Sequence, residues 1–456
     1  MVLMKTRKEK DSLGIIEVPA DALYGAQTQR AVDNFPISGQ PMPEDFIRAV
    51  VQIKRSAALA NAELDALPVD IAKAIVGACD RLLAGEHADQ FPVDIYQTGS
   101  GTSTNMNVNE VIARLASDAL QQTVSPNDHV NCSQSSNDVI PTAIHLSAST
   151  SLQRDLLPAL QALQNTLRHR AAECAAQIKT GRTHLMDAMP VSLGQELEGW
   201  ADQLDKCGSR LQQHLEFLAQ LAQGGTAVGT GVNAEEGFAD AFVAQLNTLT
   251  GAHFVAPKRR FDLMASQDTA VALSGELKTL AVALSKICND LRWMNSGPLA
   301  GLGEIQLPTL QPGSSIMPGK VNPVIPEAVL MVAATVIGND TSITVAGQSG
   351  NFQLNVMLPL VASKLPESIK LLSNACTVLG EKAVAGFTVN EPALQANLAK
   401  NPVLVTALNP VIGYLKAAEI AKRAYAENRP IIDVAEEDTD IPRSELERLL
   451  DPARLV

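Results

Sequence analysis

Apolar residues recur at helical spacing along most of the chain after Pro141. The clearest seam comprises Leu273, Leu277, Leu280, Leu284, Ile287 and Leu291. Gaps of four and three residues place such positions on one face of a helix. The seam therefore predicts a helix over residues 266–294, ~40 Å long at about 1.5 Å per residue. Helices of this length are typical of helix bundles.

Three further segments continue the same pattern. A leucine seam runs from Leu152 to Leu167, and Pro158 is expected to kink this helix or to lie in its first turn. Two long apolar segments follow at residues 323–345 and 354–379. Four or five long helices form an elongated bundle, whose remaining apolar faces we expect other copies of the chain to cover.

Shorter patterns flank the predicted bundle. The first ~140 residues mix short helical stretches with loops, and residues 97–109 are dense enough in Gly, Ser, Thr and Asn to predict a turn-rich segment. After Thr388 the helical periods shorten and charge increases. We therefore expect a mainly α, three-domain subunit. Its parts are a mostly helical amino-terminal domain (1–137), a central long-helix bundle (138–388) and a small helical carboxyl-terminal domain (389–456).

Composition supports the helical prediction and limits the partners. Hydrophobic residues make up 46% of the chain but aromatic residues only 4%. Ala and Leu lead the helix propensity scale, whereas strands favour aromatic and β-branched residues. The net charge of −13 gives no broad basic surface for nucleic acid or for an anionic membrane, so we expect neither partner.

The sequence predicts neither export nor membrane insertion. An apolar run over residues 328–338 is bounded by Glu327, Asn339 and Asp340, and it is shorter than the ~20 residues that span a bilayer. The charged amino end has no apolar signal region. The six cysteines have no CxxC spacing, which is typical of reduced thiols, so we expect a cytoplasmic protein.

Four segments are too polar and too rich in glycine for ordinary helix or core. They are residues 99–107, 131–138, 181–187 and 313–323. Taken singly, each can be a loop whose Ser, Thr and Asn side chains cap neighbouring helices. Together they offer many neutral hydrogen-bond donors, the Lys320 cation and His184, a set that suits a small substrate with carboxylate groups. The glycines of GSSIMPGKVNP at residues 313–323 suit a mobile flap that brings Ser314 to the substrate.

Motifs for other chemistries are absent from the sequence. Residues 224–231 (GGTAVGTG) resemble a glycine-rich phosphate loop, but no lysine follows at the required place, and we expect a loop between helices. The sequence has no HExxH motif, and its seven histidines are dispersed, which argues against a metal site. It has no GxSxG elbow, which argues against a hydrolase triad. We therefore expect neither a metal nor an organic cofactor.

The motif GSSIMPGKVNP resembles the signature loop of the fumarase/aspartase superfamily, and the other three polar segments match the superfamily's shared regions in the same order. The resemblance runs from about Glu9 to the carboxyl-terminal LVTALNPVIGY. The combination of GRTHLMDA, SQSSND, MPGK and TALNPVIGY is most similar to the class II fumarases, the metal-free fumarate hydratases of this superfamily.

The resemblance implies both an activity and an assembly. The activity is that of a carbon–oxygen lyase of the tricarboxylic acid cycle, which reversibly hydrates fumarate to (S)-malate by anti addition of water through an aci-carboxylate intermediate. The assembly is a homotetramer of nearly all-helical, three-domain subunits, with each active site built from three subunits. No metal or organic cofactor takes part.

Roles for individual residues follow from the same resemblance. Ser314 matches the flap serine that removes the malate C3 proton, His184 matches the histidine that handles the water or hydroxyl, and Glu327 matches the acid that pairs with this histidine. The family's substrate-binding positions match Ser100, Gly101, Thr102, Ser135, Ser136, Asn137, Thr183, Ser315, Lys320, Val321 and Asn322. A serine is a poor base unless its alkoxide is stabilised, so we expect flap amides or the Lys320 charge close to Ser314.

Departures from the fumarase pattern bear on the substrate. The family's second, non-catalytic dicarboxylate site matches Ser125, Pro126, Asn127 and Asp128. At this site the chain has Ser125 in place of the usual histidine. It also has Gln353 at a position where many fumarases carry glutamate, and in this it is similar to aspartases. Ser136 bears on the choice between the two activities, because aspartases usually have threonine there. Aspartate ammonia-lyase is therefore one alternative, and a catalytically silent structural member of the superfamily is the other.

Overall fold

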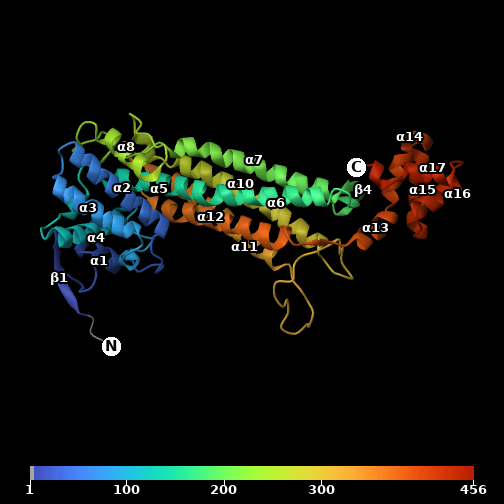
Figure 1. The fold of residues 1–456 in the computed structure, drawn as a ribbon, viewed down its shortest axis with the longest axis horizontal. Coiled ribbons are helices and arrows are strands. Elements are labelled where there is room, and N and C mark those ends of the chain that lie inside the picture. The colour runs from blue at the N-terminus through green and yellow to red at the C-terminus, as the bar shows by residue number, and fades with distance from the viewer. Residues whose placement is uncertain (1–4) are drawn as a thin grey trace. The chain divides into compact units, whose positions relative to one another are not determined.

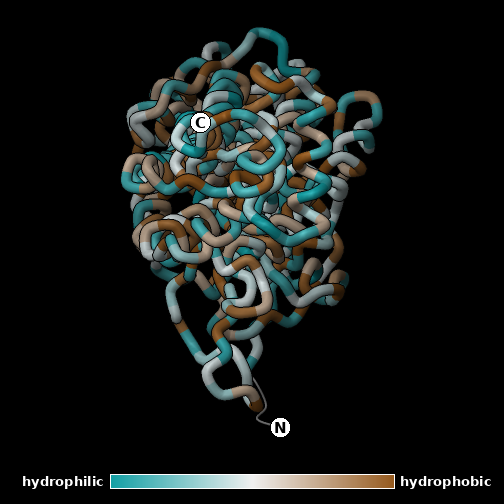
Figure 2. The backbone as a smooth tube through the Cα atoms, turned by 90° about the vertical axis from the view of Figure 1, so that its right-hand side faces the viewer, coloured by the Kyte–Doolittle hydropathy of each residue, from teal (hydrophilic) through white to brown (hydrophobic). Residues whose placement is uncertain are grey.

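The computed structural model describes residues 5–456, so the first four residues of the predicted amino-terminal domain lie outside the described residues. The described residues form 17 α-helices, joined by turns and four antiparallel two-stranded sheets (Figure 1). Hydrophobic and hydrophilic positions alternate in short stretches along the backbone, as expected of helices that bury one face (Figure 2). The predicted mainly α fold is confirmed.

Five long helices correspond to the predicted bundle helices and their neighbours. They are α6 (Leu157–Glu173), α7 (Leu193–Leu218), α10 (Asp268–Met294), α11 (Val324–Gly347) and α12 (Leu358–Leu379). Every member of the predicted seam from Leu273 to Leu291 is fully buried on α10. Pro158 lies in the first turn of α6, as predicted. The long-helix predictions are therefore confirmed.

The described chain divides into two compact units. The first comprises the residues up to Pro158 together with Ser209–Ala281 and Ala334–Ser373, and the second comprises Ala159–Gly208, Val282–Ala333 and Asn374–Val456. The boundaries fall within the five long helices. The division into three domains stays a prediction.

The first unit contains most of the helices outside these five that precede the carboxyl-terminal region. Its α-helices, apart from the long ones, are α1 (Ala26–Asn34), α2 (Glu44–Glu63), α3 (Val69–Leu83), α4 (Thr102–Leu120), α5 (Ser136–Ser151), α8 (Phe238–Thr250) and α9 (Phe261–Ala265). Short helical turns are η1 (Ala88–Gln90), η2 (Pro126–Val130) and η3 (Leu152–Leu156). Its hairpins pair β1 (Thr6–Asp11) with β2 (Gly14–Pro19), in the register Thr6 to Pro19, and β6 (Gly350–Asn351) with β7 (Leu354–Asn355).

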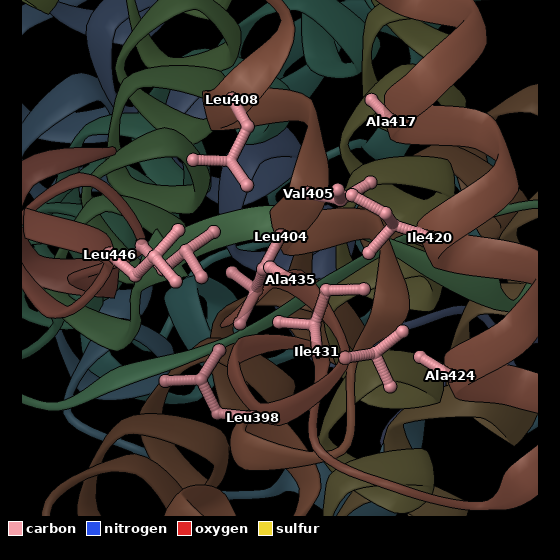
Figure 3. Close-up of a cluster of buried hydrophobic side chains, with 12 residues drawn as sticks. Leu398, Leu404, Val405, Leu408, Ala417, Ile420, Ala424, Ile431, Ala435 and Leu446 are labelled. Atoms are coloured by element: carbon pink, nitrogen blue, oxygen red, sulfur yellow. The ribbon is translucent and has the colours of Figure 1, made fainter. Parts of the chain in front are cut away.

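The second unit ends in a helical region with a core of its own. Its strands form the pairs β3 (Ile178–Thr183) with β4 (Met186–Ser192) and β5 (Ile305–Gln306) with β8 (Thr388–Val389). After the turn η4 (Gly380–Val384), the helical segments are α13 (Glu391–Ala399), η5 (Pro402–Leu408), α14 (Asn409–Ile412), α15 (Tyr414–Glu427), α16 (Ile431–Asp438), α17 (Arg443–Leu449) and η6 (Pro452–Arg454). Leu404, Leu408, Ile420 and Leu446 belong to a buried cluster confined to this region (Figure 3). The predicted helical character of the tail is confirmed.

The prediction of a turn-rich segment over residues 97–109 is wrong beyond residue 101, because α4 begins at Thr102. Asn105, Asn107 and Asn109 are buried on this helix, and their side-chain amides donate hydrogen bonds to groups outside it. These tertiary bonds replace the local backbone bonds through which asparagine ordinarily favours turns. The amino-terminal helices are also longer than predicted, since α2 alone has 20 residues.

Helix α11 matches the predicted apolar segment 323–345 and extends well beyond the run of residues 328–338 that was considered as a possible membrane span. Its 24 residues are long and apolar enough to cross a membrane by length and composition alone, with 33% of the apolar window buried within the chain. One such helix is weak support for a membrane span, because core helices of soluble proteins have the same composition. The prediction missed this property because it stopped at Asn339 and Asp340, whereas the helix continues through them to Gly347.

Candidate active site

In the first unit, the Ser100–Thr102 segment forms the amino end of α4. Gly101 is its N-cap residue, with φ of 75°, and a Cβ atom there would lie 2.9 Å from a side-chain atom of Ile140. A Cβ atom on Gly99 would lie 1.9 Å from the carbonyl oxygen of Val356. Ser100 Oγ and Thr102 Oγ1 share a hydrogen bond of 2.8 Å. Glycine is therefore required at both positions to place the two hydroxyl groups side by side.

The Ser135–Asn137 segment forms the amino end of α5. The backbone N–H of Asn137 donates to Ser135 Oγ at 3.2 Å, and the backbone N–H of Ser135 donates to Asp138 Oδ1 at 2.9 Å. This reciprocal arrangement is a capping box, which satisfies helix N–H groups that otherwise lack partners. Asn137 Nδ2 donates to the carbonyl oxygen of Ala227 at 2.8 Å.

The structure brings these two segments together. Asn105, in the first turn of α4, donates through Nδ2 to Ser136 Oγ at 3.1 Å. The amino ends of α4 and α5 are therefore neighbours, and both carry predicted substrate-binding residues. Helix amino ends favour anions because their N–H groups and dipoles present partial positive charge. These two neighbouring helix ends suit a carboxylate.

The glycine-rich segment 224–231 contacts the amino end of α5. It lies in the loop between α7 and α8, as predicted. Asp138 Oδ2 accepts hydrogen bonds from the backbone N–H groups of Gly224 (3.0 Å) and Thr226 (2.9 Å). Burial raises the pKa of Asp138 to about 6, although these backbone donors and the Lys54 charge favour the ionised form. No sequence pattern indicates these contacts, since Gly224 and Thr226 lie 86 and 88 residues after Asp138.

In the second unit, His184 lies at the tip of the β3–β4 hairpin, where a loop was predicted. Thr183 pairs with Met186, and His184 and Leu185 form the turn with φ of 56° and 61°. Such left-handed φ values allow a two-residue hairpin connection. The turn is exposed. The residues on both sides of this turn pair as strands, so the segment forms a hairpin and does not cap a helix.

A buried ion-pair network fixes the base of this hairpin. Lys179 Nζ lies 2.8 Å from Glu196 Oε2 and 3.0 Å from Glu304 Oε2, and Arg182 Nη2 lies 2.7 Å from Glu304 Oε1. Glu304 is 1% exposed. Breaking one of these ion pairs would leave an uncompensated buried charge, which is strongly destabilising. The network therefore holds the strand that leads to Thr183 and His184. Sequence reasoning missed Glu304, because a single glutamate in a loop carries no recognisable pattern.

The flap of residues 313–323 has no regular secondary structure, as predicted. Ser314 Oγ accepts hydrogen bonds from the backbone N–H groups of Ile316 (3.2 Å) and Met317 (3.0 Å). The expectation that flap amides lie close to this hydroxyl is confirmed. The ends of the flap are joined by Gly313 N to Lys320 O (2.9 Å) and by Asn322 Nδ2 to Gly313 O (2.6 Å).

A cavity of about 1080 Å³ in the second unit lies against the flap. Lys320, Val321, Asn322 and Glu327 line it, together with Arg292 and other residues. Thr183, His184, Ser314 and Ser315 are not among the residues that line it. Among the described residues of this chain, no hydrogen bond or ion pair joins His184 to Glu327. The single chain therefore brings part of the predicted set together and leaves the histidine and its predicted acid unpaired with each other.

The residues predicted for a second dicarboxylate site form the turn η2 and its cap. Ser125 Oγ accepts from the backbone N–H of Asp128 at 3.1 Å and donates to Asp128 Oδ2 at 2.8 Å. The backbone N–H of Ser125 donates to His129 Nδ1 at 3.0 Å. Pro126 begins the turn, and Asn127 and Asp128 are exposed. The Ser125 hydroxyl is thus used within the turn.

Residues 5–456 contain no cluster of three or more His, Cys, Asp or Glu side chains that could hold a metal ion. Five of the six cysteines are buried, and Cys132 is half-buried.

Two family models match the chain. One, described as lyase, covers residues 14–338, and the other, described as the carboxyl terminus of fumarase C, covers residues 404–456. The chain is 62% identical to the class II fumarate hydratase 2 of Pseudomonas aeruginosa over 99% of its length and 98% of the relative's. It is 58% identical to the class II fumarate hydratase of Xylella fastidiosa strain Temecula1, over 98% of this chain and 95% of the relative.

Solved structures give the same result. The class II fumarase of Schistosoma mansoni is similar with a TM-score of 0.96 and 37% identity, over 99% of both chains. A structure described as fumarate lyase:delta crystallin of Brucella melitensis, bound to cobalt, is similar with a TM-score of 0.94 and 43% identity, over 99% of both chains.

Proposed function

This chain belongs to the lyase family that its residues 14–338 match, and we propose that it catalyses the reversible hydration of fumarate to (S)-malate, as its class II fumarate hydratase relatives are named to do. The observation in the structure that carries this proposal is the flap, where the Ser314 hydroxyl accepts two backbone N–H groups. Similarity to fumarate hydratases along nearly the whole chain favours this activity over the aspartase and silent-protein alternatives.

The chemistry requires a base for a very weak carbon acid. In the dehydration direction, the base takes a proton from C3 of malate, and the bonding pair moves into the neighbouring carboxylate as an aci-carboxylate. Return of that pair forms the C2–C3 double bond and expels the C2 hydroxyl, which leaves as water after protonation. Hydration reverses each step, with water adding to the face opposite the proton.

We assign the base to Ser314. Two amide N–H groups aimed at its oxygen stabilise the alkoxide form, in the way that an oxyanion hole stabilises negative charge. Lys320 lies in the same loop and supplies a positive charge for the substrate or for the aci-carboxylate. Ser315, Val321 and Asn322 are the remaining substrate-binding residues proposed on this loop.

We assign the acid and base that handles water to His184, with Glu327 as the carboxylate that orients it. The chain does not pair these residues with each other, so the pairing requires a second copy of the chain. Thr183, beside His184 on the hairpin, binds substrate in this proposal. The same reasoning places the Ser100–Thr102 and Ser135–Asn137 segments at the substrate carboxylates.

Assembly into a homotetramer with shared active sites is part of the proposal. Between residues 334 and 345, the exposed side of α11 carries no charge. Its members are Ala334, Thr335, Ile337, Gly338, Thr341, Thr344 and Val345. An uncharged face on so apolar a helix is typical of a subunit interface. Other copies of this chain would cover it.

Three further parts of the proposal follow from the resemblance. The enzyme uses no metal or organic cofactor, so exhaustive dialysis against a chelator should leave its rate unchanged. It acts in the cytoplasm. A second dicarboxylate site at Ser125–Asp128 requires the Ser125 hydroxyl to exchange its bond with Asp128 for one with the ligand, and Ser125→Ala should abolish any such binding without changing turnover.

The test of the proposed activity uses the ultraviolet absorbance of fumarate. Purified protein should produce fumarate from (S)-malate and none from aspartate. Ser314→Ala, measured in parallel, controls for a contaminating hydratase. Fumarate formed from aspartate with release of ammonia would replace the proposal with the aspartase activity.

A further inference from the structure

Lys54 on α2 is fully buried behind the Ser135–Asn137 segment, although no predicted role falls on it. Its Nζ donates to Asn131 Oδ1 at 2.9 Å and to Gln134 Oε1 at 3.2 Å. Lysine has the strongest tendency of all side chains to stay exposed, and burying its charge is costly unless hydrogen bonds replace water. A lysine buried at this place therefore requires an explanation.

The two hydrogen bonds of Lys54 fix the orientation of two side-chain amides. Because Lys54 donates to both amide oxygens, the NH₂ groups must point the other way. Asn131 Nδ2 donates to the carbonyl oxygen of Gln134 at 3.0 Å, and Gln134 Nε2 donates to the carbonyl oxygens of Val130 (3.0 Å) and Cys132 (3.1 Å). The turn before α5 is thus tied to α2 in one orientation.

The fixed orientation passes on to Ser136. Asn131 Oδ1 also accepts from Asn105 Nδ2 at 3.1 Å, so the NH₂ group of Asn105 must face it. The same Nδ2 donates to Ser136 Oγ at 3.1 Å. Ser136 is therefore an acceptor on its inner side, and no described acceptor receives its hydroxyl hydrogen. A hydroxyl group has a single hydrogen to donate, so this hydrogen stays available to a substrate carboxylate.

We propose that Lys54 is a positioning residue for the substrate: through Asn131 and Asn105 it sets the direction of a hydrogen-bond chain that leaves Ser136 as a donor to a substrate carboxylate. This inference rests on the proposed function of the Ser135–Asn137 segment. Asn131 Oδ1 also accepts from Asn109 Nδ2 at 3.1 Å, but Lys54 is the only cation among its three donors. Without Lys54, the Asn131 and Asn105 amides can turn over together, and Ser136 can then donate its hydrogen to the Asn105 oxygen.

The direction of the chain does not depend on the protonation of Lys54. Burial lowers the pKa of Lys54 to about 7, and the charge of Asp138 opposes that shift. A neutral amine still has two N–H donors, which is the number of acceptors that Lys54 contacts. Lys54 therefore sets the same direction on both sides of that pKa.

The test measures KM and kcat for fumarate in the assembled enzyme with Lys54→Met, Ser136→Ala and the double variant. Lys54→Met keeps the length of the side chain and removes every donor. It should raise KM on the order of tenfold, the effect of losing one hydrogen bond to a charged group, with a smaller change in kcat. The double variant should have about the KM of Ser136→Ala alone, because residues that act in one network are not additive.

Arg48→Met is the matched control, because Arg48 is a half-buried cation on the same helix that donates to the carbonyl oxygen of Leu83 instead. It should leave KM unchanged. Lys54→Gln retains an N–H donor without the charge and should recover part of the lost affinity. Additive effects of Lys54→Met and Ser136→Ala on KM would overturn the inference, since they would give Lys54 a purely structural role.

If Lys54→Met does not fold, Asn105→Asp tests the same chain. An aspartate has the shape of asparagine but can only accept from Ser136, so KM should rise, and Ser136→Ala should add little to that rise. An unchanged KM in folded Asn105→Asp enzyme, or full additivity with Ser136→Ala, would contradict the inference. Failure of the wild-type enzyme to hydrate fumarate would instead overturn the proposed function.

Discussion

At the scale of single residues, the proposed role of Ser314 as the base makes the most specific prediction. Ser314→Ala should lower kcat on the order of 10²–10⁴-fold, because it would remove the proposed general base, and it should change KM less. Steady-state kinetics in both directions measures the split. Ser315→Ala is the neighbouring control and should act mainly on KM. Near-normal turnover in Ser314→Ala would place the base elsewhere.

His184 and Glu327 predict a pH profile. Water must lose a proton in hydration and the hydroxyl must gain one in dehydration, so the pH profiles of both directions should share one limb that belongs to the group handling water. His184→Asn should abolish this limb. Glu327→Gln should move this limb to lower pH, because the substitution removes the negative charge that favours the protonated ring. A limb that persists unchanged in His184→Asn would leave the histidine only a binding role.

Motifs in the sequence indicated candidate residues, but few of the contacts that these residues make. The sequence motif indicated Ser314 as the candidate base. Because a serine base needs stabilising donors, nearby amides were also predicted, and the structure has them at Ile316 and Met317. Lys54 and Glu304 could not be predicted, because each acts through partners more than 75 and 120 residues away, respectively. A buried charge has no local signature, since its environment is made entirely by the fold.

At the scale of elements, the flap depends on Gly313. A Cβ atom there would lie 2.5 Å from the carbonyl oxygen of Lys320 and 2.8 Å from the backbone nitrogen of Asn322. Gly313→Ala should therefore displace the flap and lower kcat on the order of 10²-fold, the effect of a displacement of about 1 Å at a reacting group. Thermal unfolding should change little. Gly77→Ala, in a helix with open space at its Cβ position, is the control for kinetics.

The spacing of apolar residues predicted the long helices well and the polar helices and strands poorly. Leu273 and Leu277 lie on the buried face of α10, because helix period and burial coincide there. Asn105 and Asn109 instead lie inside α4, where bonds to Asn131 outweigh their preference for turns. The strands beside His184 were missed because the hairpin of β3 and β4 is held by ion pairs at its base rather than by alternating apolar residues.

At the scale of the whole molecule, the uncharged face of α11 is the surface through which the proposed homotetramer would assemble. Light scattering should give about four times the chain mass of 48.4 kDa. Ile337→Asp should dissociate it and abolish activity while the helical circular dichroism persists, because a charge buried in an interface has no partner. Val69→Asp, on an exposed apolar residue of α3, is the matched control and should remain tetrameric. An active Ile337→Asp monomer would contradict the shared-site assembly.

Folding of the Ser100–Thr102 segment during synthesis depends on the close approach of Gly99 to Val356. The Ser100–Thr102 segment is held partly by Val356 and by the bond from Leu358 N to Gly99 O at 3.0 Å, so its final anchor lies more than 250 residues downstream. A nascent chain emerges amino end first, and its early segments wait for such partners. The proposed carboxylate-binding segment Ser100–Thr102 therefore becomes complete only after most of the chain has left the ribosome, and a chain on a ribosome stalled before residue 356 should not yet bind fumarate.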